Sequence, residues 1–254
     1  MQDISVKNIF NRLRIDVFFL AIVPSLAVGA TLATFMTLSF ICVSIAGPAD
    51  TATFTYKELN RGVLSTSDFN VVRTSRGYTI SVSSLKDGEQ SIQELVCDST
   101  FATQTWHYQS NRNTDISFTR VLDHIEVTGT FHGKPQKKTL TIDGHPWCQI
   151  VPLGLQTASR DSSGRSKLWA ISLEEPAMLK AVCFSVAGIS NELLPHHPEI
   201  RCLCFHMNIQ GLPGAIWTGN YFIRLKDHVF VYFEGHMYGS KKPTATIESI
   251  IHNK

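Results

Sequence analysis

The sequence predicts an all-β protein: a curled antiparallel meander, as a half-barrel or an open barrel, preceded by one N-terminal transmembrane helix. Three observations predict it: an uncharged apolar run near the N-terminus, period-two alternation beyond it, and short polar connections between the alternating segments. The 254 residues are 43% hydrophobic and 17% charged, with a formal net charge of +2. This composition excludes an intrinsically disordered chain, and it argues against nucleic acid as a partner because no broad basic face is available.

The apolar run spans residues 17–46 and contains no ionisable side chain except the thiol of Cys42. A bilayer core about 30 Å thick needs about 20 apolar residues in a helix, so this run is long enough to cross it. The apolar core of a cleaved signal peptide usually has only ~7–15 residues. We therefore expect a signal anchor that stays on the protein. The alternative is a long signal segment that is cut after Ala46.

Basic residues beside the run predict its orientation. Arg12 and Arg14 lie just before it, and the positive-inside rule then places residues 1–16 in the cytoplasm as a short tail. Residues 47–53 follow as a linker of small residues, and residues 54–254 form one outer domain. The sequence thus predicts a single-pass inner-membrane protein with its bulk in the periplasm, or a cleaved periplasmic protein in the alternative.

The outer domain shows its first clear alternation in a hairpin, where residues 69–73 and 78–83 flank a turn at 74–77. Asp87-Gly88 supplies the positive φ angles that the next tight reversal needs. Further strands are expected at 91–97, 103–109, 116–120, 125–131, 138–142, 168–173, 177–185, 200–209, 220–225, 228–233 and 244–251. Because most connections are too short to cross over between parallel strands, neighbouring strands should pair antiparallel.

Three stretches interrupt the strands. Residues 146–157 are expected as a short helix or an irregular segment, and residues 158–167 and 187–198 as loops. No break in composition divides the outer region, so we expect a single domain. A sheet with one apolar face must cover that face by curling, by a second sheet or with a ligand.

Several short motifs resemble a pattern of bacterial envelope proteins. They are Thr105-Trp106, Ile125-x-Val127-x-Gly129, Ile142-Asp143-Gly144-His145-Pro146-Trp147-Cys148-Gln149, Leu168-Trp169-x-Ile171 and Trp217…Tyr221-x-x-Arg224-x-x-Asp227…Tyr232-x-x-Gly235. The chain resembles uncharacterised Gram-negative envelope proteins that have a signal segment and one antiparallel, half-barrel-like β domain, distantly similar to the periplasmic lipoprotein carriers. Cys148 departs from the pattern, which has an aromatic residue there. The resemblance implies a non-enzymatic protein that holds a lipid or an acylated partner in a concave sheet.

The five cysteines of the outer domain leave two arrangements open. They are Cys97, Cys148, Cys183, Cys202 and Cys204. An oxidising compartment would allow up to two disulfides with one thiol left over, but the irregular spacing favours buried free thiols. The motif Cys202-x-Cys204-x-His206, with His196 and His197 upstream, places possible zinc ligands on one strand face. Structural zinc sites normally use other spacings, so the sequence predicts no metal site and no cofactor.

Catalytic signatures are missing from the sequence. It has no Gly-x-Ser-x-Gly elbow, phosphate-binding loop or dinucleotide fingerprint. Asp143-x-His145 could imitate a catalytic pair, whereas Glu174 and Glu175 would face opposite sides of a strand. We therefore expect that the protein is not an enzyme.

Aromatic side chains are the candidates for a ligand-binding wall. The expected residues are Trp106, Trp147, Trp169, Trp217, Tyr221 and Tyr232. Large aromatics usually fill a core, and the functional alternative is that these side chains line an apolar cavity. The predicted function is a membrane-tethered binding protein for a lipid or acyl ligand. The alternatives are an assembly module that recruits another envelope protein and, less favoured, a metal-dependent enzyme.

Overall fold

The computed structural model describes residues 51–60, 63–161, 167–174, 178–211, 217–237, 243 and 245–250. The expected cytoplasmic tail, the expected transmembrane segment and the first part of the expected linker therefore lie outside the described residues. Within the described ranges, no helix has both the length and the apolar character needed to cross a bilayer.

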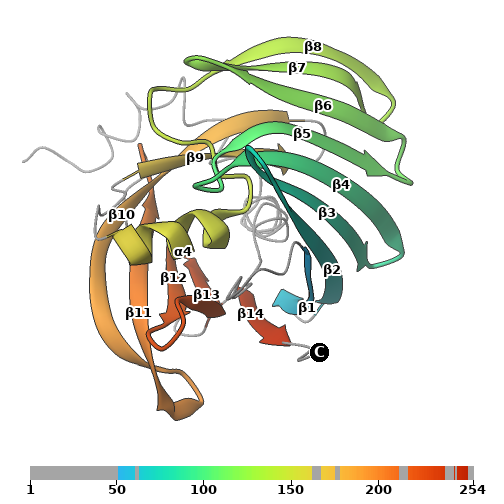
Figure 1. Cartoon of the computed structure of the whole chain (residues 1–254). Helices are drawn as coiled ribbons and strands as arrows, with labels where there is room; N and C mark the ends of the chain where they lie inside the picture. The colour runs from blue at the N-terminus through green and yellow to red at the C-terminus, as the bar shows by residue number, and fades with distance from the viewer. Residues whose placement is uncertain are drawn as a thin grey trace, which may run out of the picture.

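The described chain is all-β, as predicted, and forms one antiparallel sheet of 14 strands that curls without closing (Figure 1). The strands are β1 (Thr51–Asn60), β2 (Val63–Thr74), β3 (Gly77–Lys86), β4 (Glu89–Asp98), β5 (Thr103–Ser110), β6 (Thr114–Val121), β7 (His124–Phe131), β8 (Lys134–Thr141), β9 (Lys167–Glu174), β10 (Met178–Leu194), β11 (His197–Ile209), β12 (Trp217–Arg224), β13 (Val229–Met237) and β14 (Ala245–Ile250). Their order across the sheet is β8-β7-β6-β5-β4-β3-β2-β1-β14-β13-β12-β11-β10-β9. The chain thus builds two meanders, which the β1–β14 pair joins.

The first strand was missed by the sequence analysis. β1 begins at Thr51, inside the expected linker, and pairs with both β2 and β14. Phe54 and Tyr56 are buried at alternate positions, while threonines occupy much of the other face. Threonine has a high β propensity but low hydrophobicity, so the alternation is weak in the sequence.

The expected loop at 187–198 is also wrong. β10 continues to Leu194 and returns as β11 from His197, through a turn in which His196 has a φ of 66°. A register shift between Val186 and Gly188 lets the long strand bend and still pair. Ser190, Asn191 and Glu192, which resemble a loop in sequence, occupy consecutive paired positions of β10 and are partly or fully exposed.

The segment between β8 and β9 contains the only helix among the described residues, α4 (Val151–Asp161). Pro152 suits the first turn of a helix because its missing N–H needs no partner there. Because α4 extends to Asp161, residues 158–161 are helical and not part of the expected loop. Residues 162–166, the rest of that expected loop apart from Lys167, lie outside the described ranges. α4 packs against β12 and β13, on the inner side of the curl (Figure 1).

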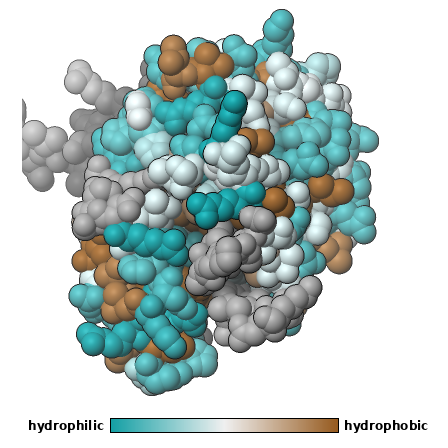
Figure 2. Space-filling model, in the orientation of Figure 1, coloured by the Kyte–Doolittle hydropathy of each residue, from teal (hydrophilic) through white to brown (hydrophobic). Residues whose placement is uncertain are grey.

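The inner face of the sheet carries the core. Alternate residues of each strand point inward, and the largest fully buried side chains include Trp106, Phe118, Phe205, Tyr221 and Phe233. The rings of Trp106 and Phe118 stack with their centroids 4.6 Å apart. The outer surface is mixed, with hydrophilic residues over much of the face in Figure 2 and hydrophobic residues in small separate groups.

Residues 146–149 form a strap that joins β9, at one edge of the curled sheet, to β5 in the first meander. The backbone N–H of Thr103 in β5 donates to Trp147 O at 2.6 Å, and Cys148 N–H donates to Trp169 O in β9 at 2.8 Å. A third contact joins β8 to β10, where Lys138 Nζ donates to Leu179 O at 3.0 Å. This strap holds the curl without a continuous ladder between β8 and β9.

Gln149 is the best-bonded side chain of the strap. It is buried, and its Oε1 accepts from Ile171 N–H at 2.9 Å and from Trp147 Nε1 at 3.1 Å. Its Nε2 donates to Ile171 O at 3.1 Å. The amide therefore imitates a backbone pair beside β9, and an aliphatic side chain in its place would leave Ile171 N–H and C=O without these partners.

We expect Gln149→Ala to lower the free energy of unfolding by at least about 2 kcal/mol, because it leaves several buried polar groups without partners. Urea unfolding of the purified protein measures this loss. The control is Gln104→Ala, since Gln104 is exposed and makes one hydrogen bond, at 3.3 Å. Equal effects of the two substitutions would contradict the role of the strap.

Asp143 anchors the beginning of the same segment. Its Oδ1 accepts from Trp169 Nε1 at 2.6 Å and from the backbone N–H of His145 at 2.9 Å. Burial of the carboxyl raises its pKa, but the hydrogen bonds from Trp169 and His145 together outweigh burial and lower the pKa to about 2. The Asp143-x-His145 motif thus serves as a turn anchor in this structure.

Because folding lowers the Asp143 pKa, its stabilisation is complete above the unfolded value near ~3.9 and is lost as the pH falls through about 2. The side chain is 46% exposed, so solvent screening limits the effect of Asp143→Asn at pH 7 to about 1 kcal/mol. We expect this difference from the wild type to shrink below about pH 4. Urea unfolding at a series of pH values tests it, and a difference independent of pH would contradict it.

Candidate ligand-binding site

The inner face changes from apolar to polar along the strands of the first meander. In β2, Ser65 and Ser67 face inward at one end of the strand, and Phe69 and Val71 face inward further along it. β3 repeats this with Ser84 and Lys86 after Ile80 and Val82, and β4 with Ser91 and Gln93 before Leu95 and Cys97. Neighbouring strands are antiparallel, so their polar ends meet at one rim of the curl. The result is a polar zone beside a packed apolar core.

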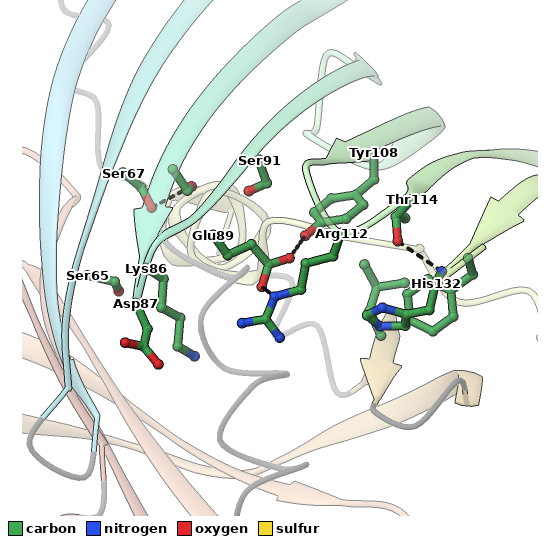
Figure 3. A pocket seen from close by; sticks show the side chains of 13 residues that line it. Ser65, Ser67, Lys86, Asp87, Glu89, Ser91, Tyr108, Arg112, Thr114 and His132 are labelled. Atoms are coloured by element: carbon green, nitrogen blue, oxygen red, sulfur yellow. Dashed lines mark hydrogen bonds and ion pairs between the residues drawn. The ribbon is translucent and has the colours of Figure 1, made fainter.

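A cavity of about 200 Å³ lies in this polar zone. Its lining comes from β2 to β7, from the turns beside them and from β9, and consists of Ser65, Ser67, Ser84, Lys86, Asp87, Glu89, Ser91, Tyr108, Arg112, Thr114, Phe131, His132 and Leu173. Figure 3 shows the labelled side chains of these strands gathered around the same space. Phe131 and Leu173 supply an apolar wall, whereas hydroxyl and charged groups supply the rest.

Glu89 is at the centre of the polar groups (Figure 3). Its Oε2 lies 3.1 Å from Arg112 Nε, and its Oε1 accepts a hydrogen bond from Tyr108 Oη at 3.4 Å. Burial, together with the charge of Glu89, raises the pKa of Tyr108 to about 12. Tyr108 therefore remains a neutral hydrogen-bond donor at physiological pH.

The other side of the cavity is rich in hydroxyl groups. Ser67 Oγ and Ser84 Oγ share a hydrogen bond of 2.8 Å, and Ser65 Oγ donates to Glu58 Oε2 at 3.3 Å. His132 follows β7 in a turn with a φ of 48°, where its backbone N–H donates to Thr114 Oγ1 at 3.1 Å. These bonds hold the lining in place before any ligand arrives.

The charges of the lining are balanced, with Lys86 and Arg112 against Asp87 and Glu89. Such a site can offer hydrogen-bond donors and acceptors to a polar group of a ligand, and that group does not need a strong net charge. The exposed fractions of the Arg112 and Glu89 side chains are 43% and 22%, so both groups remain within reach of solvent. The arrangement suits reversible recognition of a small polar group.

All six sequence-predicted site residues lie outside this cavity, and five of them lie in the core or contact the strap. Trp106 Nε1 donates to Gln93 Oε1 at 3.1 Å, and Trp169 Nε1 donates to Asp143. Trp147 belongs to the strap, and Trp217 packs edge-on against Phe184. Their polar atoms and rings are engaged within the protein.

Tyr221 and Tyr232 come from neighbouring strands but face opposite sides. Tyr221 is fully buried in the core, where its ring centroid lies 4.6 Å from that of Phe233. Tyr232 faces outward beside Phe222 and lines a different cavity, of about 480 Å³, next to the β10–β11 turn. The structure therefore does not bring the six aromatic residues together in one wall.

The sequence analysis missed the polar lining. Strand alternation could have revealed it, because every second residue of a strand faces the same side. Ser65 and Ser67 therefore face the same side as Phe69, and Ser84 and Lys86 the same side as Val82. In one strand alone, a serine at an inward position only suggests that the strand is ending. The polar lining becomes evident when the neighbouring strands are aligned and their serines lie side by side. Their pairing depends on register, which the sequence pattern alone does not give.

The five cysteines are buried free thiols in the structure, and none is within a disulfide. Burial raises the pKa of Cys97 to about 12 and that of Cys202 to about 11, so both thiols remain protonated. Cys97, for example, donates a weak hydrogen bond to Thr103 Oγ1 at 3.9 Å. They behave as small core residues, which agrees with the irregular spacing.

Comparisons with known proteins identify no family for this chain: no protein-family model matches it, and no curated protein is significantly similar to it.

The hydroxyl of Tyr221 is buried and has no hydrogen-bond partner among the described residues. We expect Tyr221→Phe to leave the free energy of unfolding unchanged or to raise it by up to ~1 kcal/mol, because it removes an unsatisfied polar group. Urea unfolding measures the change. Tyr108→Phe is the matched comparison, since it removes the bond to Glu89 and should destabilise slightly. A loss above about 1 kcal/mol for Tyr221→Phe would show that its hydroxyl is bonded in solution.

Proposed function

We propose that the chain is a non-enzymatic, membrane-tethered envelope protein that binds a lipid or acylated ligand by its polar part. The observation that carries this proposal is the hydroxyl-rich, charge-balanced cavity on the inner face of the curled sheet. Glu89 and Arg112 would recognise complementary groups of the ligand, and the serine hydroxyls would add short hydrogen bonds.

The size of the cavity restricts what it can hold. At about 200 Å³ it is smaller than the ~300–1,000 Å³ usual for sites that enclose drug-sized ligands. It suits a polar head group, while Phe131 and Leu173 can cover the first methylene groups at its edge. Each methylene removed from water would add ~0.8 kcal/mol to the binding free energy.

The apolar run at 17–46 supports the proposed location. If it remains as an anchor, it keeps the β domain beside its lipid supply and raises the effective concentration of ligand. The inner membrane, with the domain in the periplasm, is then the proposed site of action.

Native mass spectrometry of the full-length protein, extracted from membranes, tests this function. We expect a co-bound lipid or acylated species on the wild type, and at least a tenfold lower occupancy for Arg112→Gln and Glu89→Gln, because each removes one side of the charged pair in the cavity. Arg76→Gln is the matched control, since Arg76 is exposed in the β2–β3 turn.

A wild-type protein that is consistently free of ligand would contradict the proposal. So would equal ligand occupancy in Arg112→Gln and in the wild type. Far-UV circular dichroism of each variant distinguishes lost binding from lost folding.

An assembly module is the second candidate, and the outer face of β1 and β2 favours it. Leu59 and Leu64 lie opposite each other in the register and are 50% and 60% exposed. Contiguous exposed apolar side chains mark contact surfaces for other proteins, and the two leucines line one cavity with Ile200, Val231 and Tyr232. If this function is correct, Leu64→Ser should abolish a complex with an envelope partner and leave any bound lipid in place.

A further inference from the structure

Three metal-ligating side chains converge on the outward face of the β10–β11 hairpin. They are Glu192 from β10 and Cys204 and His206 from β11, and one ligand atom of each lies within 4.8 Å of the others. Phe205, which lies between Cys204 and His206 on β11, points to the opposite face of the sheet; Cys204 is itself fully buried, whereas Glu192 and His206 are partly exposed. The group is therefore separate from the polar cavity on the inner face.

The geometry of this group suits a tetrahedral ion. His206 Nε2 lies 3.3 Å from Glu192 Oε1. Two ligands about 2.0–2.1 Å from one ion, at a tetrahedral angle, are about 3.3 Å apart. Cys204 Sγ lies beside the same imidazole, 3.9 Å from Nδ1, and a ligand atom of each of the three residues lies within 4.8 Å of the others.

A second layer of hydrogen bonds orients these ligands. His206 Nδ1 lies 2.9 Å from Asn220 Oδ1, which fixes the ring so that Nε2 points toward Glu192. Asn220 Nδ2 in turn donates to Glu234 Oε1 at 2.9 Å. Ser190 Oγ lies 2.5 Å from Glu192 Oε1 and 2.8 Å from His206 Nε2, so this hydroxyl bridges the two ligand atoms and must turn away from Nε2 when an ion binds. Outer partners of this kind are characteristic of metal-binding histidines and carboxylates.

We propose that Glu192, Cys204 and His206 bind one Zn²⁺ ion, with a fourth position left open to water. The thiolate and the carboxylate together neutralise the charge of the ion, and Cys, His and Glu are all ligands that zinc accepts. The Cys204 thiol releases its proton to solvent when the ion binds, so affinity falls as the pH is lowered.

The sequence motif is only partly used by this site. Cys204 and His206 belong to it, whereas Cys202, His196 and His197 do not belong to the group. Glu192 joins the group because β10 continues through residues that the sequence predicts as a loop, and this places Glu192 beside β11. The ion joins two paired strands, so binding should also raise the melting temperature.

Cobalt titration of the full-length protein tests the site, because Co²⁺ reports its own coordination. After treatment with a chelator, we expect one Co²⁺ per chain, a near-ultraviolet thiolate-to-cobalt band and intense visible bands from four-coordinate cobalt. Zn²⁺ should displace the cobalt, and elemental analysis should find one zinc per chain.

Variants assign the ligands individually. Cys204→Ser should abolish the thiolate band, and Glu192→Gln and His206→Gln should each weaken Zn²⁺ binding at least tenfold. Asn220→Ala, which disturbs only the outer layer, should weaken it ~10–100-fold. Cys202→Ser is the matched control: Cys202 is buried on the same strand face but lies outside the group, so binding should be unchanged.

No cobalt band at stoichiometric metal, or loss of the band in Cys202→Ser instead of Cys204→Ser, would overturn the proposal. If Cys204→Ser does not fold, the half-exposed Glu192→Gln decides the matter, because an unchanged affinity in that variant is also contradictory.

Discussion

The structure depends on one constraint: the apolar inner face of a 14-stranded sheet must be kept from water. With one helix to cover it among the described residues, the sheet meets this constraint mainly by curling until side chains from its two meanders pack together. A curled sheet that does not close needs something to hold its ends. The strap at 146–149 joins the edge strand β9 to β5 of the first meander through backbone bonds, and Gln149 satisfies polar groups that would otherwise be buried without partners.

The same curl explains where a binding site can exist. Aromatic rings such as Trp106 and Tyr221 are fully buried and fill the centre of the curl. Inward positions near the rim cannot be packed as tightly, and they carry Ser67, Ser84 and Glu89 instead. A ligand would therefore meet hydroxyl and charged groups first, which is why the proposed function concerns the polar part of a lipid.

The outward face has its own chemistry because every strand presents two faces. On β11, Phe205 lies on one face of the strand, while Cys204, which is also buried, and the partly exposed His206 lie on the other. The proposed zinc site and the proposed ligand site thus use opposite sides of the same sheet. Each can be lost by substitution without disturbing the other, provided that the core residues remain.

The sequence by itself determined the all-β class, the antiparallel pairing and the Asp87-Gly88 turn, because alternation and turn chemistry are local properties. Register and curvature decided what the sequence left open. They extended β10 through a polar stretch, placed Glu192 beside His206, and aligned serines of three strands into one cavity. They also place five of the six candidate aromatic residues in the core or against the strap, away from the polar cavity. The physical reason is that a side chain's role in a sheet depends on which residues of other strands lie opposite it, and those residues are distant in the sequence.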